Sequence, residues 1–263
     1  MGKRENCSSR RCHLKRRTPF QGMITIARFN WPFYLGAVLV VIASAAGLFF
    51  FSDVGLKFGC VMALLCSGYF LVGSLGVSHL VYARSELYRW SWLHGVLTGA
   101  KNRRGVFCHS GFDDASAGLR ERFDDVHWDI LDHYDEKRMT EPSIRRARAM
   151  FPPGPGTVAS PYGAWPMRSE LADLIIGFLA IHEFRTEKER TAWFCEAKRC
   201  LRDGGRIVLV EHARDLANFL AFGPGFFHFH SPSSWRRCWE AAGLRMGEQF
   251  RVTPFVRVFV LCP

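Results

Sequence analysis

Two long apolar runs lie near the start of the chain, and short apolar runs alternate with polar stretches after them. The first long run extends from Phe33 to Phe51, nineteen residues without a charged side chain. A helix rises about 1.5 Å per residue, so a run of that length crosses the hydrocarbon core of a bilayer. The second run, from Phe58 to Tyr82, contains no Asp, Glu, Lys or Arg. Since only six residues join the two runs, the pattern predicts a two-helix transmembrane hairpin at residues 33–82.

The distribution of charge predicts which side of the membrane the hairpin ends face. The chain carries 35 Lys and Arg against 24 Asp and Glu, a formal net charge of +11. Residues 1–32 hold eight of these cations and one anion, and Arg84 and Arg89 follow the second run. Cytoplasmic segments of membrane proteins are enriched in Lys and Arg, so we expect a multi-pass protein of the cell inner membrane with its following domain in the cytoplasm. The cations form a basic tail suited to anionic lipid headgroups, and we expect no nucleic-acid partner.

Beyond an amphipathic connector at residues 83–102, strand-like and helix-like segments alternate. Strands are predicted at residues 105–109, 126–132, 157–159, 172–181, 206–211, 245–252 and 255–261. Helices are predicted at 114–123, 186–201 and 233–242, and a further one begins after Thr140, a candidate N-terminal cap, with Pro142 in its first turn. Such alternation indicates an α/β domain at residues 103–263, with a mostly parallel sheet that binds ligands at the carboxyl ends of its strands.

One part of this domain resembles a known family. The sequence ELADLIIGFLAIHEF, an amphipathic helix and then RCLRDGGRIVLVEH resemble the fourth and fifth strands of class I S-adenosylmethionine-dependent methyltransferases, especially the ubiquinone/menaquinone methyltransferase-like, type 11 branch. The most specific piece is the spacing from Asp173 to Leu201-x-x-Gly204-Gly205 before an apolar strand. The resemblance covers about residues 103–263. It implies a Rossmann-like sheet with an antiparallel last strand, S-adenosylmethionine (SAM) as the cofactor, and methyl transfer as the reaction.

The sequence departs from that family after the first strand. The family places an acidic residue and a Gly-x-Gly-x-Gly turn there, because the cofactor approaches the backbone closely. Here the segment reads VFCHSGFDDAS, and only one of the glycines is present. The cofactor contacts that the resemblance implies are His109, Gly111, Asp113 and Ala180, with either Asp132 or Asp135 as the acid that binds the ribose.

Four of the ten histidines follow neighbouring strands of the predicted sheet. His182 and Glu183 come after the fourth strand, His212 after the fifth, and His228 and His230 lie in the next loop. Three interpretations stay open for this cluster: proton transfer by histidine, a divalent metal held by imidazoles and carboxylates, or structural hydrogen bonding. We assign His182, His212 and Glu183 as catalytic candidates and assign no residue as a metal ligand.

The loop that contains the last two histidines is unusually aromatic. Residues 213–231 include RDLANFLAFGPGFFHFH, and its phenylalanines would be costly to leave in water. Two interpretations stay open: these side chains belong to the ordinary core, or, in a membrane-tethered chain, they form a lid that admits a lipid-like acceptor. Arg214, Phe226, His228 and His230 are the substrate-binding candidates, although Arg214 is also placed to pair with Asp215.

Two classes of function follow from these patterns. The leading hypothesis is a membrane-anchored SAM-dependent methyltransferase that acts on a lipid-like or otherwise apolar acceptor. The alternative is a non-catalytic methyltransferase-like membrane protein that binds a partner or ligand, or a metal-assisted enzyme that uses the histidine cluster. Nine cysteines without a CxxC pair favour neither a zinc ribbon nor a disulfide framework. We expect the bilayer and the acceptor as partners and no obligate protein partner.

Overall fold

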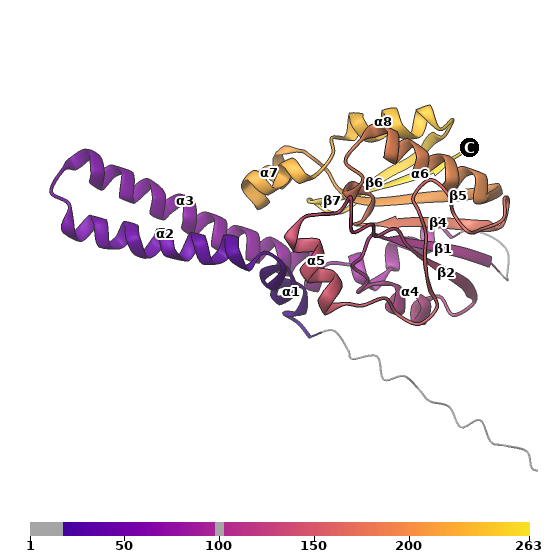
Figure 1. The fold of residues 1–263 in the computed structure, drawn as a ribbon. Helices are drawn as coiled ribbons and strands as arrows, with labels where there is room; N and C mark the ends of the chain where they lie inside the picture. The colour runs from indigo at the N-terminus through magenta and orange to yellow at the C-terminus, as the bar shows by residue number, and fades with distance from the viewer. Residues whose placement is uncertain (1–17, 98–102) are drawn as a thin grey trace, which may run out of the picture.

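The computed structural model describes residues 18–97 and 103–263. It consists of an α/β domain and a helical hairpin that projects from one end of it (Figure 1). The helices are α1 (Gln21–Phe29), α2 (Trp31–Phe50), α3 (Val54–His79), α4 (Ser116–Arg122), α5 (Pro142–Met150), α6 (Glu187–Cys200), α7 (Leu216–Phe222) and α8 (Pro232–Ala241). The strands are β1 (Arg103–His109), β2 (Val126–Asp132), β3 (Thr157–Ala159), β4 (Ala172–Phe178), β5 (Leu201–His212), β6 (Arg245–Thr253) and β7 (Val256–Cys262).

The seven strands form one sheet in the order β3-β2-β1-β4-β5-β7-β6. Strands β1 to β5 pair in parallel, whereas β7 is antiparallel to both β5 and β6. The predicted mostly parallel sheet with an antiparallel last strand is therefore confirmed. The strand order reverses between β1 and β4, and ligands of open α/β sheets bind at such a switch point, beyond the carboxyl ends of the strands.

Local sequence signals explain most element ends. Thr186 caps α6 through a reciprocal pair of hydrogen bonds with Glu189, and Gly204 takes a φ of +74° where the pairing of β5 with β4 is irregular, between Leu201 and Arg206. Several predicted element ends differ from the structure, among them the start of β5, which lies at Leu201 and not at residue 206. Residue Glu141, not Thr140, is the N-terminal cap residue of α5. The fourth strand ends at Phe178, because the chain then turns into a short 3-10 helix, Ile181–Glu183.

Different segments cover the two faces of the sheet. Buried residues of α5, α6 and α8 form a core on one face, and those of α4 and the connector form a core on the other. Within the connector, Leu87, Trp90 and Leu93 are at most 1% exposed. The described part of the connector, residues 83–97, is therefore a structural layer of the domain. The rest of it, and residues 1–17 of the basic tail, lie outside the described residues.

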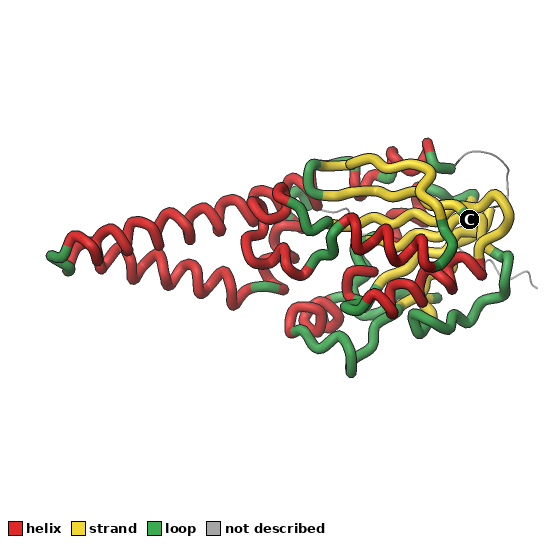
Figure 2. The backbone as a smooth tube through the Cα atoms, turned by 90° about the horizontal axis from the view of Figure 1, so that it is seen from above, coloured by secondary structure: helices red, strands yellow, loops and turns green. Residues whose placement is uncertain are grey.

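The hairpin consists of α2 and α3 packed side by side (Figure 2). By length and composition both helices are able to cross a membrane, and most of their apolar side chains are exposed. Small residues make the contact between them: a Cβ on Gly47 would lie 2.7 Å from Sγ of Cys60. Close backbone approach at small residues is typical of helices packed in lipid. Helix α3 begins at Val54, earlier than predicted, because Asp53 caps it by accepting from the Leu56 amide.

Helix α1 was not predicted and lies at the base of the hairpin, beside α5 (Figure 1). The Arg146 Nε of α5 donates to the backbone carbonyl of Phe29 over 2.6 Å. The ring of Phe29 packs edge-on against Phe112 and Phe151. This helix therefore links the hairpin to the carboxyl edge of the sheet.

Candidate active site

A cavity of about 720 Å³ lies between the carboxyl ends of β1, β4 and β5 and the base of the hairpin. The sheet side is lined by residues at the strand ends, namely Phe107, Ser110, Phe178, Leu179, Ala180 and His212. The opposite wall comes from α1, α2, α3 and the π-helical segment Leu80–Arg84, and it includes Gly22, Phe29, Tyr34, Phe70 and Tyr82. Apolar residues make up more than half of the lining, and His182, Glu183, Arg185 and His228 gather where the end of β4 meets the aromatic loop. The cavity thus joins the predicted ligand edge of the sheet to the predicted membrane segment.

His182 is held in a fixed orientation by Glu211, the last but one residue of β5. One carboxylate oxygen of Glu211 accepts hydrogen bonds from three successive backbone amides, Ala180 to His182, at 2.8–3.2 Å. The other oxygen lies 2.6 Å from Nδ1 of His182. The Glu211 carboxylate is fully buried. Because the carboxylate fixes the Nδ1 proton, Nε2 of His182 is left facing Glu183, 3.7 Å from Oε1.

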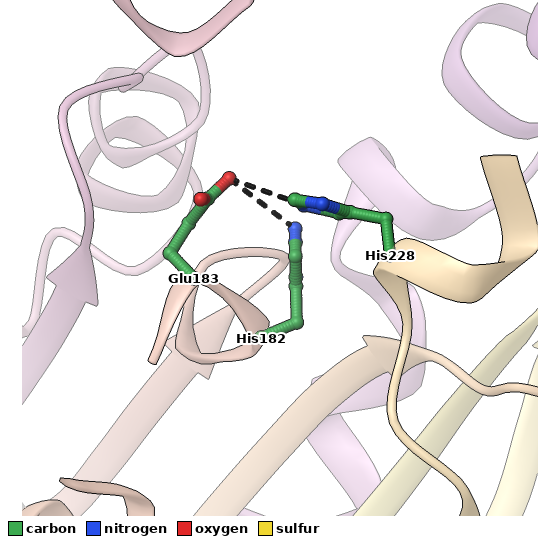
Figure 3. A group of neighbouring side chains, drawn as sticks. All are labelled: His182, Glu183 and His228. Carbon is green, nitrogen blue, oxygen red and sulfur yellow. Dashed lines mark ion pairs between the residues drawn. The ribbon is translucent and has the colours of Figure 1, made fainter. Parts of the chain in front are cut away.

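His228 lies between two carboxylates at the edge of the same cavity. Its Nε2 is 3.4 Å from Oε1 of Glu183, and its Nδ1 is 3.3 Å from Oε1 of Glu141. Burial opposes the charged form of His228, but its contacts with the two carboxylates outweigh that effect and raise its pKa to about 9. His182, Glu183 and His228 thus converge, with Glu183 pointing at both rings (Figure 3). One atom of each lies within 4.8 Å of the others.

His212 also lines the cavity, but both of its ring nitrogens are engaged. Its Nδ1 lies 3.0 Å from the Phe255 carbonyl, and its Nε2 lies 2.9 Å from the hydroxyl of Tyr82. Burial lowers its pKa to about 4, so the ring is neutral and the Tyr82 hydroxyl donates to it. Of the three catalytic candidates, the structure brings His182 and Glu183 together and gives His212 a bridging position between β5 and the hairpin.

The four substrate candidates take different positions. His228 lines the cavity, whereas His230 is buried behind it and accepts a hydrogen bond of 2.9 Å from Arg190. Arg214 donates to the carbonyls of Phe229 and Phe227, so the alternative in which it pairs with Asp215 is not the one observed. Asp215 pairs with arginines of β6 and β7 instead. Phe226 is not among the residues that line the cavity, and its ring packs edge-on against another phenylalanine of the aromatic loop.

The cofactor candidates of the first loop are occupied by contacts within the protein. Asp113 accepts from the amides of Ala115 and Ser116, the N-cap and first residues of α4. Asp132 is 3% exposed, and one of its oxygens accepts from the amide of Gly111 over 2.9 Å. The side chain of Arg148, from α5, donates to the other oxygen. Each carboxylate is therefore already hydrogen-bonded.

The remaining cofactor candidates differ in burial. The side chain of Asp135 is 42% exposed and accepts from the amide of Lys137 in a surface turn. His109 is 1% exposed, and neither ring nitrogen has a hydrogen-bond partner among the described residues. Ala180 lies at the wall of the cavity. Only Ala180 of the six cofactor candidates lines the cavity.

The residues near the end of β1 fit SAM in part: Ser110 is placed to bind a polar atom of it, whereas Asp132 is not free to bind its ribose. The hydroxyl of Ser110 is buried with no hydrogen-bond partner among the described residues, and Ser110 lines the cavity, so a polar ligand atom has a partner there. The ribose end does not fit, because Arg148 occupies Asp132 and the ring of Tyr134 lies over Gly111. A Cβ on Gly111 would be 2.7 Å from that ring. Binding of a ribose at Asp132 requires Arg148 to leave the carboxylate.

Comparisons with known proteins find similarity in structure alone. No family model matches the chain, and no curated protein matches it. The solved structures that it resembles include a SAM-dependent methyltransferase from Aquifex aeolicus, 14% identical, with a TM-score of 0.49 over 67% of this chain and 90% of that one. A SAM-dependent methyltransferase from Leishmania major is 12% identical, with a TM-score of 0.49 over 88% and 83%. Geranyl diphosphate C-methyltransferase from Streptomyces coelicolor is also 12% identical, with a TM-score of 0.48 over 71% and 81%.

Proposed function

We propose that this chain is a membrane-anchored SAM-dependent methyltransferase whose acceptor is apolar and lipid-like. The observation that carries the proposal is the position of the cavity. One wall is the ligand-binding edge of the kind of sheet that the sequence resemblance implies, and the other wall is the base of an apolar hairpin. An acceptor that resides in the bilayer would reach this cavity without crossing water.

The aromatic loop supports a lipid-like acceptor. Helix α7 lies beside α3, and the hydroxyl of Tyr69 donates to the carbonyl of Leu220 over 2.8 Å. Leu216, Phe219, Leu220 and Phe227 are 45–71% exposed. Apolar side chains gathered next to a membrane helix are stabilised when they lie in the interfacial region of the bilayer. The loop would then form the membrane-facing rim of the cavity.

The chain's own contribution to methyl transfer would be orientation and proton removal. SAM supplies an electrophilic methyl group, and the transfer depends chiefly on how the acceptor is positioned. Glu211 holds the Nδ1 proton of His182, so Nε2 is available as a proton acceptor for a hydroxyl or amine of the acceptor. The apolar wall excludes water from the same space.

The proposal is tested in two stages on full-length protein in lipid nanodiscs. Calorimetric titration with SAM and S-adenosylhomocysteine measures cofactor binding, and transfer of labelled methyl groups into a membrane-lipid extract measures activity. The proposal predicts saturable binding of both cofactor forms and label in the lipid fraction, lost in the His182→Gln variant. Absence of any saturable signal at millimolar cofactor excludes methyl transfer from SAM.

A second candidate function is favoured by the contact between Arg148 and Asp132. With the ribose-binding position closed by an arginine, the cavity would serve to bind a lipid-like ligand without methyl transfer. The same titration distinguishes the two functions. Binding of a lipid with no binding of SAM supports the non-catalytic function.

A further inference from the structure

The nitrogens and oxygen at the polar end of the cavity have the arrangement of a metal-ligand set. We name His182, Glu183 and His228 the triad. The two Nε2 atoms lie 3.7 and 3.4 Å from Oε1 of Glu183, and the His182 and His228 ring centroids are 5.0 Å apart. Ligand atoms at about 2.0–2.2 Å from a zinc ion in a tetrahedral site are about 3.3–3.6 Å from one another. Small rotations of the three side chains would therefore bring all three atoms to one ion.

Both histidines of the triad have a carboxylate on their other ring nitrogen. Glu211 lies on Nδ1 of His182 at 2.6 Å, and Glu141 lies on Nδ1 of His228 at 3.3 Å. A histidine that binds a metal almost always donates its second ring N–H to a carboxylate, carbonyl or water, which fixes the ring and raises its basicity. A general base requires only one pair of a histidine and a carboxylate. The structure has two such pairs, and the Nε2 atoms of both histidines lie near Oε1 of Glu183.

The charge of this region also favours a cation. Glu183 and Glu211, beside the two imidazoles, are mostly buried carboxylates, 13% and 0% exposed, whereas Glu141 is 49% exposed. The guanidinium of Arg185, which lines the same cavity, donates to the backbone carbonyls of His182 and His228 and to none of these carboxylates. Buried carboxylates require a counter-charge. A divalent ion bound by the triad would supply this charge in place of a proton on His228.

We propose that the triad binds one divalent first-row transition ion, with the remaining coordination positions directed into the cavity. Two imidazoles and one carboxylate suit zinc, iron(II) or manganese(II) better than magnesium or calcium, which prefer oxygen ligands. All three triad residues line the cavity, so an oxygen of a bound molecule would reach the ion directly. This inference does not depend on SAM, because the triad lines the cavity and Asp132 does not. It replaces the role proposed above for His182, because a nitrogen that binds a metal cannot also accept a proton.

The experiment measures metal binding alone. Full-length protein in nanodiscs is stripped with a chelator, then titrated with Zn²⁺ by calorimetry and with Co²⁺ by visible absorption. We expect one ion per chain and the d–d bands of a nitrogen- and oxygen-ligated Co²⁺ site. The variants His182→Gln and His228→Gln should each weaken binding by more than about 100-fold, and Glu141→Gln, which changes only the outer carboxylate, by about 10- to 100-fold.

A matched control is His127→Gln, because His127 is 70% exposed and lies in β2, outside the triad. Its affinity should equal that of the wild type. Thermal melting of each variant shows whether it is folded, and His228, whose side chain is 24% exposed, should tolerate substitution better than the more buried His182. No saturable binding to the folded wild type, or equal loss in the His127 control, would overturn the metal site. Either result leaves the SAM titration as a separate test of methyl transfer.

Discussion

Replacement of Arg148 by methionine tests whether the ribose of SAM binds at Asp132, one of the two acids that the sequence resemblance implies for it. In the structure the Arg148 side chain is 27% exposed and bonded to Asp132, which is 3% exposed. Methionine keeps an apolar stem but removes every donor. It also removes the cation that lies 4.9 Å from the centroid of the Tyr134 ring. The variant Arg148→Met would therefore free one oxygen of Asp132 without adding a competing hydrogen bond.

The size of the effect follows from the burial of the pair. Loss of one partner from a fully buried ion pair costs about 3–5 kcal/mol of folding stability. Here Arg148 is partly exposed, and the amides of Gly111 and Tyr134 still donate to Asp132, so a cost of about 1–3 kcal/mol is expected. If SAM must displace Arg148, the same free energy is recovered on binding. The affinity for SAM should then rise by about 5- to 150-fold in the variant.

The assay is calorimetric titration of SAM against wild type, Arg148→Met and Arg148→Met with Asp132→Asn. Arg145→Met is the matched control, because Arg145 lies on the same helix and donates to the Thr140 carbonyl at the surface. The reasoning predicts tighter binding in Arg148→Met, no change in the control, and loss of the gain in the double variant. Equal affinity in folded wild type and Arg148→Met would refute the role of Arg148 as a competitor for the ribose position.

Three further predictions concern stability and membrane contact. His133 donates from Nδ1 to the Ser160 carbonyl and accepts on Nε2 from Trp193, and burial lowers its pKa to about 4. Because the unfolded chain binds a proton at this histidine below about pH 6.5 and the folded one does not until about pH 4, the free energy of unfolding should fall over that range by up to about 1.4 kcal/mol per pH unit. The His133→Gln variant should therefore show a shallower loss of melting temperature between pH 7 and pH 5, and an unchanged slope contradicts this assignment. A fragment of residues 83–263 should melt cooperatively and one of residues 103–263 should not, because the connector covers one face of the sheet; identical melting curves would be contrary to that prediction. Changing Phe219 and Leu220 to serine should weaken labelling of α7 by a lipid-soluble photoprobe and leave labelling of α2 unchanged, whereas equal labelling would argue against membrane contact of the loop.

Much of the fold was predictable because strands and helices of this domain have strong local signals. The second and third strands were predicted with their observed bounds, since the second, VHWDILD, begins with alternating apolar and polar residues and the third, TVA, is a short run that includes two β-branched residues. Helix α7 was missed because its sequence LANFLAF is short and apolar and has no polar face to give a helical period. Helix α1 was missed because it directly follows the charged tail in the sequence and is positioned by packing against α5.

The candidate site was predictable only as far as strand ends determine it. His182 and Glu183 follow β4 and His212 ends β5, so the order of the sheet brought all three to the wall of the cavity. What the sequence did not indicate is which side chains would pair with them. Glu141 precedes α5 and reaches His228 across the cavity, more than eighty residues away in the chain, and no local pattern signals such a contact. The hydrogen-bond partners of each histidine ring decide whether the ring is able to bind a ligand or accept a proton. Those partners are set by packing between segments that are distant in the sequence.

Helix α5 carries both Arg148, which contacts Asp132, and Arg146, which contacts Phe29. Freeing Asp132 by moving α5 as a body would break the contact of Arg146 with Phe29 in α1, and so disturb the base of the hairpin. Ile144 and Ala147 of the same helix are buried in the core, and a body movement would expose them at a cost of about 1–2 kcal/mol or more. Rotation of the partly exposed Arg148 side chain avoids that cost. We therefore expect Arg146→Met to leave the affinity for SAM unchanged, and a gain equal to that of Arg148→Met would instead show that α5 moves with the hairpin.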